Sequence, residues 1–207
     1  MHIIRGGESP AYLAERYLGD RKKSWVIEDA NEDIPFKKNR AIIIPMKKGN
    51  RGGLTKRGYQ VVPVLCYHRF SVQCKSSLCM PTHIFNRQMK YLKNNGFRVV
   101  SLGELLGFLQ YRQALPKKSV AITIDDGFRS TYDIAYPILK KYGFTATLFI
   151  YTGFIGQSKN AMTWNQLRRV KAWGFEVGSH TLSHVDLTKK NEGEVERAYW
   201  VRVRKEL

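Results

Sequence analysis

The sequence predicts an α/β protein in which a parallel sheet follows a small unit of two helices and two short strands. Within residues 61–207, apolar runs of strand length alternate with helical segments, and this order is typical of a parallel sheet covered by helices. Between the two parts, residues 46–60 contain four glycines and five basic residues but no acidic residue. That composition predicts a linker.

The composition supports a folded protein with an anionic partner. The 207 residues are 43% hydrophobic, which is enough for a core, and the net charge is +18. Such a charge suits nucleic acid, an anionic lipid surface or an acidic cell-envelope polymer. No run approaches the ~18 apolar residues of a membrane span. The first residues lack the apolar core of a secretory signal, so we expect a cytosolic protein or a fragment without its export segment.

The first unit is expected to have the order β-α-α-β. The opening apolar residues predict a short strand. Ser9 and Pro10 predict the start of a helix, and Gly19 predicts its end. A second short helix is predicted at residues 24–31 and a closing strand at residues 41–45.

The second unit is expected to alternate strands and helices throughout. Helix 82–96 should bury Phe85, Met89 and Leu92 on one face, because they recur at helical spacing. The predicted strands are residues 59–68, 97–102, 119–124, 145–151 and 175–179. The remaining helices are predicted from residue 101, at 129–143 and 163–174, and at 192–205 near the end of the chain.

The three cysteines leave two interpretations open. Cys74 and Cys79 share a loop-like stretch and are either a local disulfide or free thiols. Cys66 lies in an apolar run that reads as a buried strand, so we expect it to be a small core residue.

Polar residues gather where three predicted strands end. His68 follows the first strand, Asp125 and Asp126 the third, and His180 the fifth. His184 comes four residues after His180, so a helical turn would direct both imidazoles to the same side. Function in α/β sheets gathers at the carboxyl ends of the strands. Two imidazoles and one carboxylate would make a three-ligand metal site.

The adjacent aspartates fit this interpretation because a cation offsets their repulsion. Gly127 would let the chain turn so that both carboxylates reach one site. One of them would bind the metal, and the other would accept a proton from water. Each part alone has a simpler explanation, namely a helix-capping turn, an ordinary helix face or a partly buried histidine.

Taken together, these motifs resemble the polysaccharide deacetylases, also called NodB-homology proteins or family-4 carbohydrate esterases. The stretches "TIDDGF" and "SHTLSH" are similar to the first two motifs of that family, and "CYHRF", "YPILKKYGFTATLFI" and "GFEVGSH" also match. The resemblance implies a distorted (β/α) barrel. It also implies that Asp125 is the catalytic base and that Asp126, His180 and His184 bind a divalent metal, zinc first, with cobalt or nickel as alternatives.

The early "YH" resembles the circularly permuted branch of the family, and this implies that His68 is the general acid. About 250 residues are usual for a complete barrel, so the chain is expected to hold an incomplete one. The family's reaction is the hydrolysis of N-acetyl groups on polysaccharides that contain N-acetylglucosamine. The resemblance also implies a place in the cell envelope or outside the cytoplasm.

The first unit resembles a LysM domain, which binds N-acetylglucosamine glycans. The matching residues are "LAERYLGD", Trp25, Asn31 and the terminal "IIIP", whereas "KKNRA" departs from the usual turn before the last strand. The expected division is therefore a LysM-like domain at 1–45, a linker at 46–60 and a deacetylase domain at 61–207. This module favours peptidoglycan as the substrate over exopolysaccharide or chitin-like chains.

Three alternatives remain. The chain could be a non-catalytic glycan-binding protein with an inert partial barrel. A nucleic-acid binder is suggested by charge alone, because aromatic residues do not interleave with the basic linker. A non-haem iron oxygenase also uses two histidines and a carboxylate, but it would leave Asp125 without a role.

Overall fold

The computed structural model describes residues 1–46, 50–55 and 58–207. Of the predicted linker, residues 47–49 and 56–57 lie outside the described residues. The chain forms two compact units. The first contains Met1–Val61 and Gly103–Ser119, and the second contains Val62–Leu102 and Val120–Leu207.

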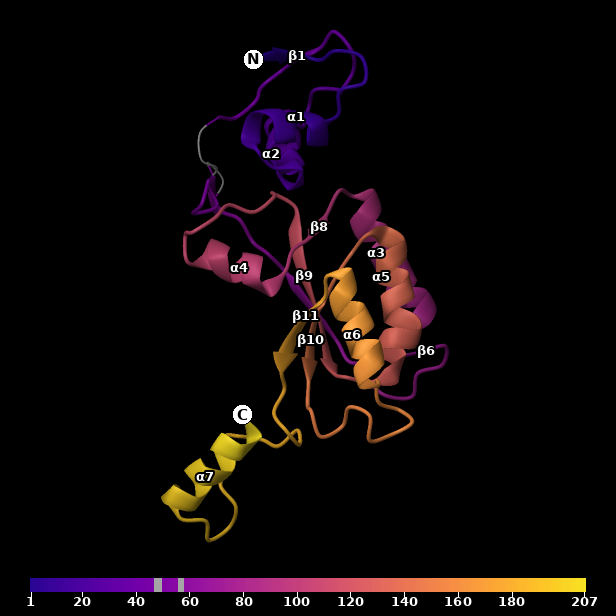
Figure 1. Cartoon of the computed structure of the whole chain (residues 1–207), viewed down its shortest axis with the longest axis vertical. Coiled ribbons are helices and arrows are strands. Elements are labelled where there is room, and N and C mark those ends of the chain that lie inside the picture. Colours follow the sequence, from indigo (N-terminus) through magenta and orange to yellow (C-terminus); the bar gives the residue numbers. More distant parts are fainter. Residues whose placement is uncertain (47–49, 56–57) are drawn as a thin grey trace. The chain divides into compact units, whose positions relative to one another are not determined.

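The first unit has the predicted β-α-α-β order (Figure 1). Ser9 begins helix α1 by accepting a hydrogen bond from the Tyr12 N–H, and Gly19 ends it with φ 70°. Strand β1 pairs antiparallel with β2. The elements are β1 (His2–Ile3), α1 (Pro10–Leu18), a 3₁₀ turn (Arg21–Lys23), α2 (Ser24–Ala30) and β2 (Ala41–Ile42). The core consists of Ile4, Leu13, Ala14, Ile27 and Ile42.

Asn31 joins the second helix to the closing strand of this unit. Its buried side-chain amide donates to the carbonyls of Ile27 and Ile43, at 2.7 and 2.8 Å, and its oxygen accepts from the Ile43 N–H at 2.8 Å. A buried amide that makes three hydrogen bonds fixes the spacing between α2 and the chain after β2. Asn31 is therefore a structural residue of this unit.

The first unit also includes a later part of the chain. Strands β3 (Leu54–Thr55) and β4 (Gly58–Tyr59) form a short antiparallel pair, and most of helix α4 (Leu102–Leu109) belongs here. The Lys117 N–H donates to the Asp29 carboxylate at 2.9 Å. The structure thus groups residues 103–119 with the first unit, while the division at 45 and 60 stays a prediction.

The second unit is built on a parallel sheet with the strand order β11-β10-β9-β5, and β8 also pairs with β9. These five strands correspond to the five predicted from the sequence. The eight-residue β9 is buried almost throughout, as expected for a central strand. The strands are β5 (Val64–Tyr67), β8 (Arg98–Val99), β9 (Ser119–Asp126), β10 (Thr147–Ile150) and β11 (Glu176–Ser179). The described strands form an open sheet, and closure into a barrel stays a prediction.

Helices pack beside this sheet, and Figure 1 shows α3, α5 and α6 next to one another. Helix α3 buries Phe85, Met89 and Leu92 as predicted. Helix α6 begins with a complete capping box, in which Thr163 and Gln166 bind each other's backbone N–H groups. The helices are α3 (Thr82–Asn94), a π-helical turn (Thr131–Ala135) that leads into α5 (Tyr136–Tyr142), α6 (Trp164–Trp173) and α7 (Glu196–Glu206). No helix among the described residues is long and apolar enough to cross a membrane.

The prediction that the first strand is buried was wrong. Strand β5 lies at one end of the strand order, and its residues alternate between outward and inward positions. Val64 is 48% exposed and Cys66 is exposed, whereas Tyr67 is buried. Cys66 is therefore not a core residue. An apolar run of residues can form an edge strand or a central strand, so the sequence alone did not distinguish these two positions in the sheet.

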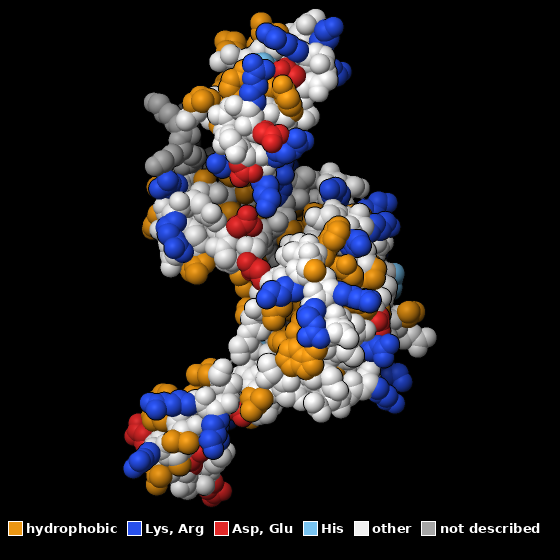
Figure 2. All heavy atoms as spheres, viewed as in Figure 1, with side chains coloured by type: hydrophobic (Ala, Val, Ile, Leu, Met, Phe, Trp, Pro, Cys, Tyr) orange, Lys and Arg blue, Asp and Glu red, His pale blue; other side chains and the backbone are white. Residues whose placement is uncertain are grey.

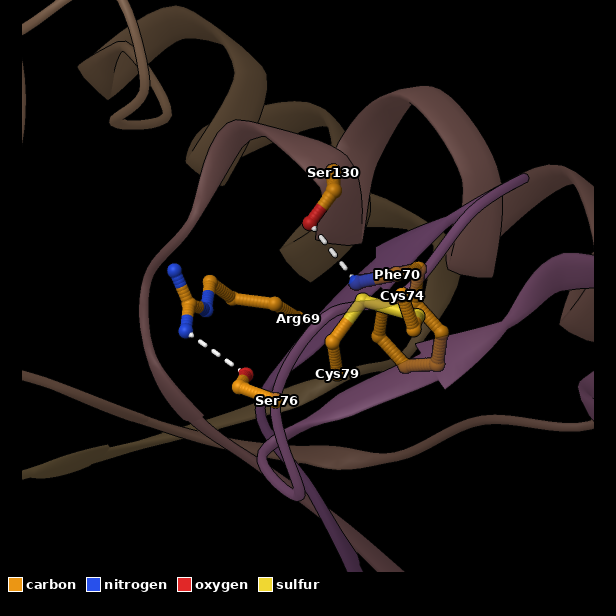
Figure 3. Close-up of a disulfide and its surroundings, with 6 residues drawn as sticks. All are labelled: Arg69, Phe70, Cys74, Ser76, Cys79 and Ser130. Carbon is orange, nitrogen blue, oxygen red and sulfur yellow. Dashed lines mark hydrogen bonds between the residues drawn. A yellow bond between two sulfur atoms is a disulfide. The ribbon is translucent and has the colours of Figure 1, made fainter.

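Cys74 and Cys79 form a disulfide (Figure 3). The disulfide closes the loop between strands β6 (Arg69–Ser71) and β7 (Cys79–Pro81), which pair in parallel. The Phe70 N–H of β6 donates to Ser130 Oγ at 3.1 Å, which ties this loop region to the chain after β9. The sequence had left a disulfide and free thiols as alternatives, and the structure has the disulfide.

Asn31→Ala should destabilise the first unit, because it leaves two carbonyls and one N–H without their partner. A loss of about 1–3 kcal/mol is expected. Amide hydrogen exchange at Ile43 is the direct measure, since this N–H donates to the Asn31 side chain. Asn31→Asp keeps the acceptor for Ile43 but buries a carboxylate oxygen against both carbonyls, so at neutral pH it should destabilise the unit at least as much as Asn31→Ala. Unchanged protection in Asn31→Ala would contradict the role assigned to Asn31.

Candidate active site

Two carboxylates stand at the carboxyl end of the buried strand β9. In a regular strand, Asp125 and Asp126 would point to opposite faces. Asp126 instead has φ 75° and Gly127 has φ 85°, so the strand's alternation ends at this point. A Cβ on Gly127 would lie 2.6 Å from Ile155 Cδ1, so this position needs glycine for space as well as for conformation. Each carboxylate nevertheless has its own set of neighbours.

The first set consists of Asp126, His180 and His184. The Nε2 atoms of His180 and His184 lie 3.6 and 3.2 Å from Asp126 Oδ1. The two imidazole rings have their centroids 4.8 Å apart at 72°. One donor atom from each of the three residues lies within 4.8 Å of the other two. The structure therefore brings together the three residues that the sequence predicted as metal ligands.

The histidines converge by a different route from the one expected. No helical turn joins them, because Thr181 has φ 72° and His184 has φ 60°. The His180 N–H donates to the Ile150 carbonyl at 2.8 Å, and the His184 N–H donates to Thr181 Oγ1 at 2.8 Å. Backbone contact with the end of β10 and a local side-chain hydrogen bond shape the segment, so the helical i, i+4 argument was wrong.

This donor set fits a divalent cation. Asp126 is only 7% exposed, and its Oδ1 is buried without a hydrogen bond among the described residues. A buried carboxylate oxygen without a partner is costly unless a cation or a proton meets it. Two imidazoles and a carboxylate are ligands that zinc and similar first-row cations accept.

The second set consists of Asp125, His68 and Cys66. His68 Nε2 lies 3.8 Å from Asp125 Oδ2, and the Cys66 thiol donates to the same oxygen at 3.3 Å. Asp125 Oδ1 is buried without a hydrogen bond among the described residues. Burial raises the pKa of the Cys66 thiol, and the hydrogen bond to Asp125 adds to the effect. The thiol is therefore protonated at neutral pH.

Cys66 was not predicted from the sequence as part of the site. The signal was present, because residues two apart in a strand share a face and Cys66 is two residues before His68. The parallel register pairs Cys66 with Thr123 and Tyr67 with Ile124, so the end of β5 lies beside the end of β9.

An aromatic side chain that the sequence analysis also missed borders the histidines. The Tyr151 ring lies 5.2 Å from the His184 ring and stacks on Phe154 at 5.0 Å and 18°. Burial raises the pKa of Tyr151, and the negative charge of Asp126 raises it further, so its hydroxyl keeps its proton at neutral pH. At Gly153 the segment after β10 lies close to the segment after β11. The Gly153 N–H donates to the Leu182 carbonyl at 2.8 Å, and a Cβ on Gly153 would lie 2.6 Å from that same oxygen.

A groove of about 730 Å³ lies beside the chain that follows β5 and β9. Arg69 follows His68 directly, and its guanidinium lies 5.2 Å from the centroid of the Phe128 ring. Arg69 also donates to Ser76 at 3.1 Å (Figure 3). The groove therefore combines cationic side chains with an aromatic face, and its other basic lining residues are Lys75, Arg129 and Lys159.

The large positive charge is not gathered at one place on the visible face. Figure 2 shows Lys and Arg side chains spread over both units, with acidic and apolar side chains between them. A nucleic-acid interface usually appears as a continuous basic patch or stripe. The visible surface thus offers no particular support for the nucleic-acid alternative.

Comparison with known proteins identifies relatives over part of the chain. A family model described as "Polysaccharide deacetylase" matches residues 112–204. YxkH of Bacillus subtilis strain 168, a protein named after the same family, is 36% identical over 126 residues, which are 61% of this chain and 44% of that protein. A poly-beta-1,6-N-acetyl-D-glucosamine N-deacetylase of Staphylococcus aureus strain MSSA476 is 33% identical over 132 residues, 59% of this chain and 44% of the relative.

The fold has solved counterparts as well. The Streptococcus pyogenes deacetylase PplD, solved in complex with acetate, matches with a TM-score of 0.59 and 31% identity over 63% of this chain and 60% of that one. The chain spans 44% of the length of these two curated relatives. The residues that the polysaccharide deacetylase model matches include both aspartates and both histidines of the sheet edge.

Proposed function

We propose that this chain carries the active site of a metal-dependent N-deacetylase that acts on polysaccharides containing N-acetylglucosamine. The observation that carries the proposal is the division of two adjacent aspartates between two sets of partners. Asp126 faces two imidazoles, whereas Asp125 faces His68. A hydrolase of this kind needs one carboxylate to hold a cation and another to accept a proton from water.

The reaction adds water across an amide and yields acetate and a free amine on the sugar. A divalent cation held by Asp126, His180 and His184 would polarise the acetyl carbonyl and favour deprotonation of water. Asp125 accepts the proton of the attacking water. Its Oδ1, which has no hydrogen bond within the described part of the chain, is the oxygen left for that proton.

His68 has the complementary role of proton donor. It lies 3.8 Å from Asp125, so both act on one small volume between β5 and β9. His68 donates a proton to the sugar nitrogen as the C–N bond breaks, because an amine leaves more easily when protonated. The assignment follows the resemblance to the circularly permuted branch, and the proximity of His68 to Asp125 supports it.

The groove with Arg69 and Phe128 suits the neighbouring sugars of a polymer. Sugar rings pack on aromatic faces, and hydroxyl groups accept hydrogen bonds from guanidinium groups. The named relative acts on poly-β-1,6-N-acetylglucosamine, so that chain is the first substrate to test. Peptidoglycan is the second because of the LysM-like unit. Either polymer places the protein at the cell envelope.

The first unit is proposed to bind the glycan as a LysM-like domain. Its β-α-α-β order and the positions of Trp25 and Asn31 support this assignment. A binding unit tethered to a catalytic one keeps the polymer at a high local concentration near the site. Zinc is the first metal to test, with cobalt and nickel as alternatives.

Removal of the metal should abolish acetate release, and zinc should restore it. Asp126→Asn and His184→Ala should each lower zinc affinity by about 10²-fold or more, because the cation loses one of three protein ligands. Equilibrium dialysis of the 207-residue chain measures the affinity. Ser183→Ala, next to His184, is the control and should bind zinc like the wild type. Acetate release that persists without metal would contradict a hydrolytic cation.

Asp125→Asn and His68→Ala should lower kcat for acetate release by about 10²–10⁴-fold, because each removes a proton-transfer group. Both variants should still bind one equivalent of zinc at the Asp126 site. This separates proton transfer from metal binding. If His68→Ala turned over at the wild-type rate, the role of general acid would pass to another residue. A chain that binds glycan and releases no acetate in any form would favour the non-catalytic alternative.

Sedimentation with insoluble peptidoglycan or chitin tests the first unit. The full chain should sediment with the glycan, and Asn31→Ala should sediment less, because it disturbs the first unit. Asp125→Asn should sediment like the wild type, since it leaves the first unit intact. If Asn31→Ala unfolded the first unit without changing sedimentation, glycan binding would belong to the second unit alone.

A further inference from the structure

The second set of side chains, Cys66, His68 and Asp125, has the composition of a metal site in its own right. A thiol, an imidazole and a carboxylate each offer one donor atom, and the three atoms lie within 4.8 Å of one another. Thiolate and imidazole are ligands that favour zinc and other thiophilic cations over magnesium or calcium. Neither the resemblance nor the proposed reaction has a use for Cys66.

The distances in this set fit a tetrahedral cation. With zinc–ligand distances of about 2.0–2.3 Å, neighbouring ligand atoms in a tetrahedron stand about 3.3–3.8 Å apart. The observed separations from Asp125 Oδ2 are 3.3 Å to Cys66 Sγ and 3.8 Å to His68 Nε2. The Asp126 set has corresponding separations of 3.2 and 3.6 Å. The separations from the carboxylate oxygen are therefore similar in the two sets.

A second observation at the same place points to a ligand. Asp125 Oδ1 is buried and has no hydrogen bond among the described residues. Cys66 is an exposed residue of the edge strand β5, so the site lies where a cation from solution can reach it. It is also the one cysteine of the chain outside the disulfide.

We infer that Cys66, His68 and Asp125 form a second site for a thiophilic divalent cation such as Zn²⁺, and that its occupation inhibits the enzyme. On binding, the cation takes the place of the thiol proton, which passes to water, while His68 and Asp125 bind through Nε2 and a carboxylate oxygen. A cation there occupies both the proton acceptor and the proton donor of the proposed reaction. The inhibition rests on the proposed function, whereas the site itself does not.

The second cation should bind more weakly than the first. Asp125 and Asp126 are neighbours, so two dications held by them repel each other at short range. Two of the three ligands of the second site also lie at the edge strand β5, where water competes for the cation. Excess zinc is therefore the condition that fills the second site.

The test counts metal ions on the 207-residue chain with its disulfide intact. Equilibrium dialysis against Zn²⁺ should give two equivalents for the wild type and one for Cys66→Ala. His184→Ala is the matched control: it should lose the Asp126 site and keep the second one. A wild type that takes up one equivalent, or a Cys66→Ala variant that still takes up two, would overturn the inference.

Cobalt provides a readout that does not require activity. Co²⁺ bound to a thiolate gives a sulfur-to-metal charge-transfer band in the near ultraviolet. The band should appear in the wild type and in His184→Ala and be absent from Cys66→Ala. His68→Ala should bind this cobalt about tenfold or more weakly, which separates a site from a lone thiol. A band that survives Cys66→Ala, or that His68→Ala leaves unchanged in affinity, would overturn the site.

Activity completes the test. Zinc beyond one equivalent should lower acetate release by the wild type, whereas Cys66→Ala should keep the activity that it has at one equivalent. Equal inhibition of both would overturn the inhibitory role. If no form released acetate, the proposed function would fail, and the metal count and the cobalt band would still decide the second site.

Discussion

The site depends on how the chain accommodates two adjacent carboxylates at the end of a buried strand. Like charges so close repel strongly in a region that water only partly reaches. The positive φ of Asp126 and Gly127 ends the strand's alternation, so the two carboxylates do not follow the opposite directions of a regular strand. Each carboxylate then meets its own partners, two imidazoles for Asp126 and a histidine and a thiol for Asp125.

The parallel sheet supplies those partners. Because β5 pairs with β9, His68 arrives beside Asp125 from one side. Because β10 pairs with both β9 and β11, the chain after β11 returns across Ile150 and brings His180 and His184 to Asp126. All these strands run in one direction, so their carboxyl ends gather at a single edge of the sheet.

Sequence patterns predicted the elements better than the turns. The Ser9 cap of α1 is a local feature, and it was visible in the sequence. The bend between His180 and His184 was not visible in the sequence, because it depends on backbone contact with the end of β10. The exposure of β5 also escaped prediction, since it depends on which strands pair. The LysM-like assignment of the first unit and the closure of a barrel remain predictions.

The family match and the structure contribute different parts of the account. Asp125, Asp126, His180 and His184 lie within residues 112–204, where the family model matches, whereas His68 and Cys66 lie before it. The proposed role of Cys66 therefore rests on its distance to Asp125, and that of His68 on the resemblance and on its distance to Asp125. A crystal structure of the chain with one equivalent of zinc tests the central claim most directly. The account predicts anomalous density bound by Asp126, His180 and His184, with Asp125 next to it and not a ligand. Zinc at Cys66, or zinc bound by both aspartates, would contradict it.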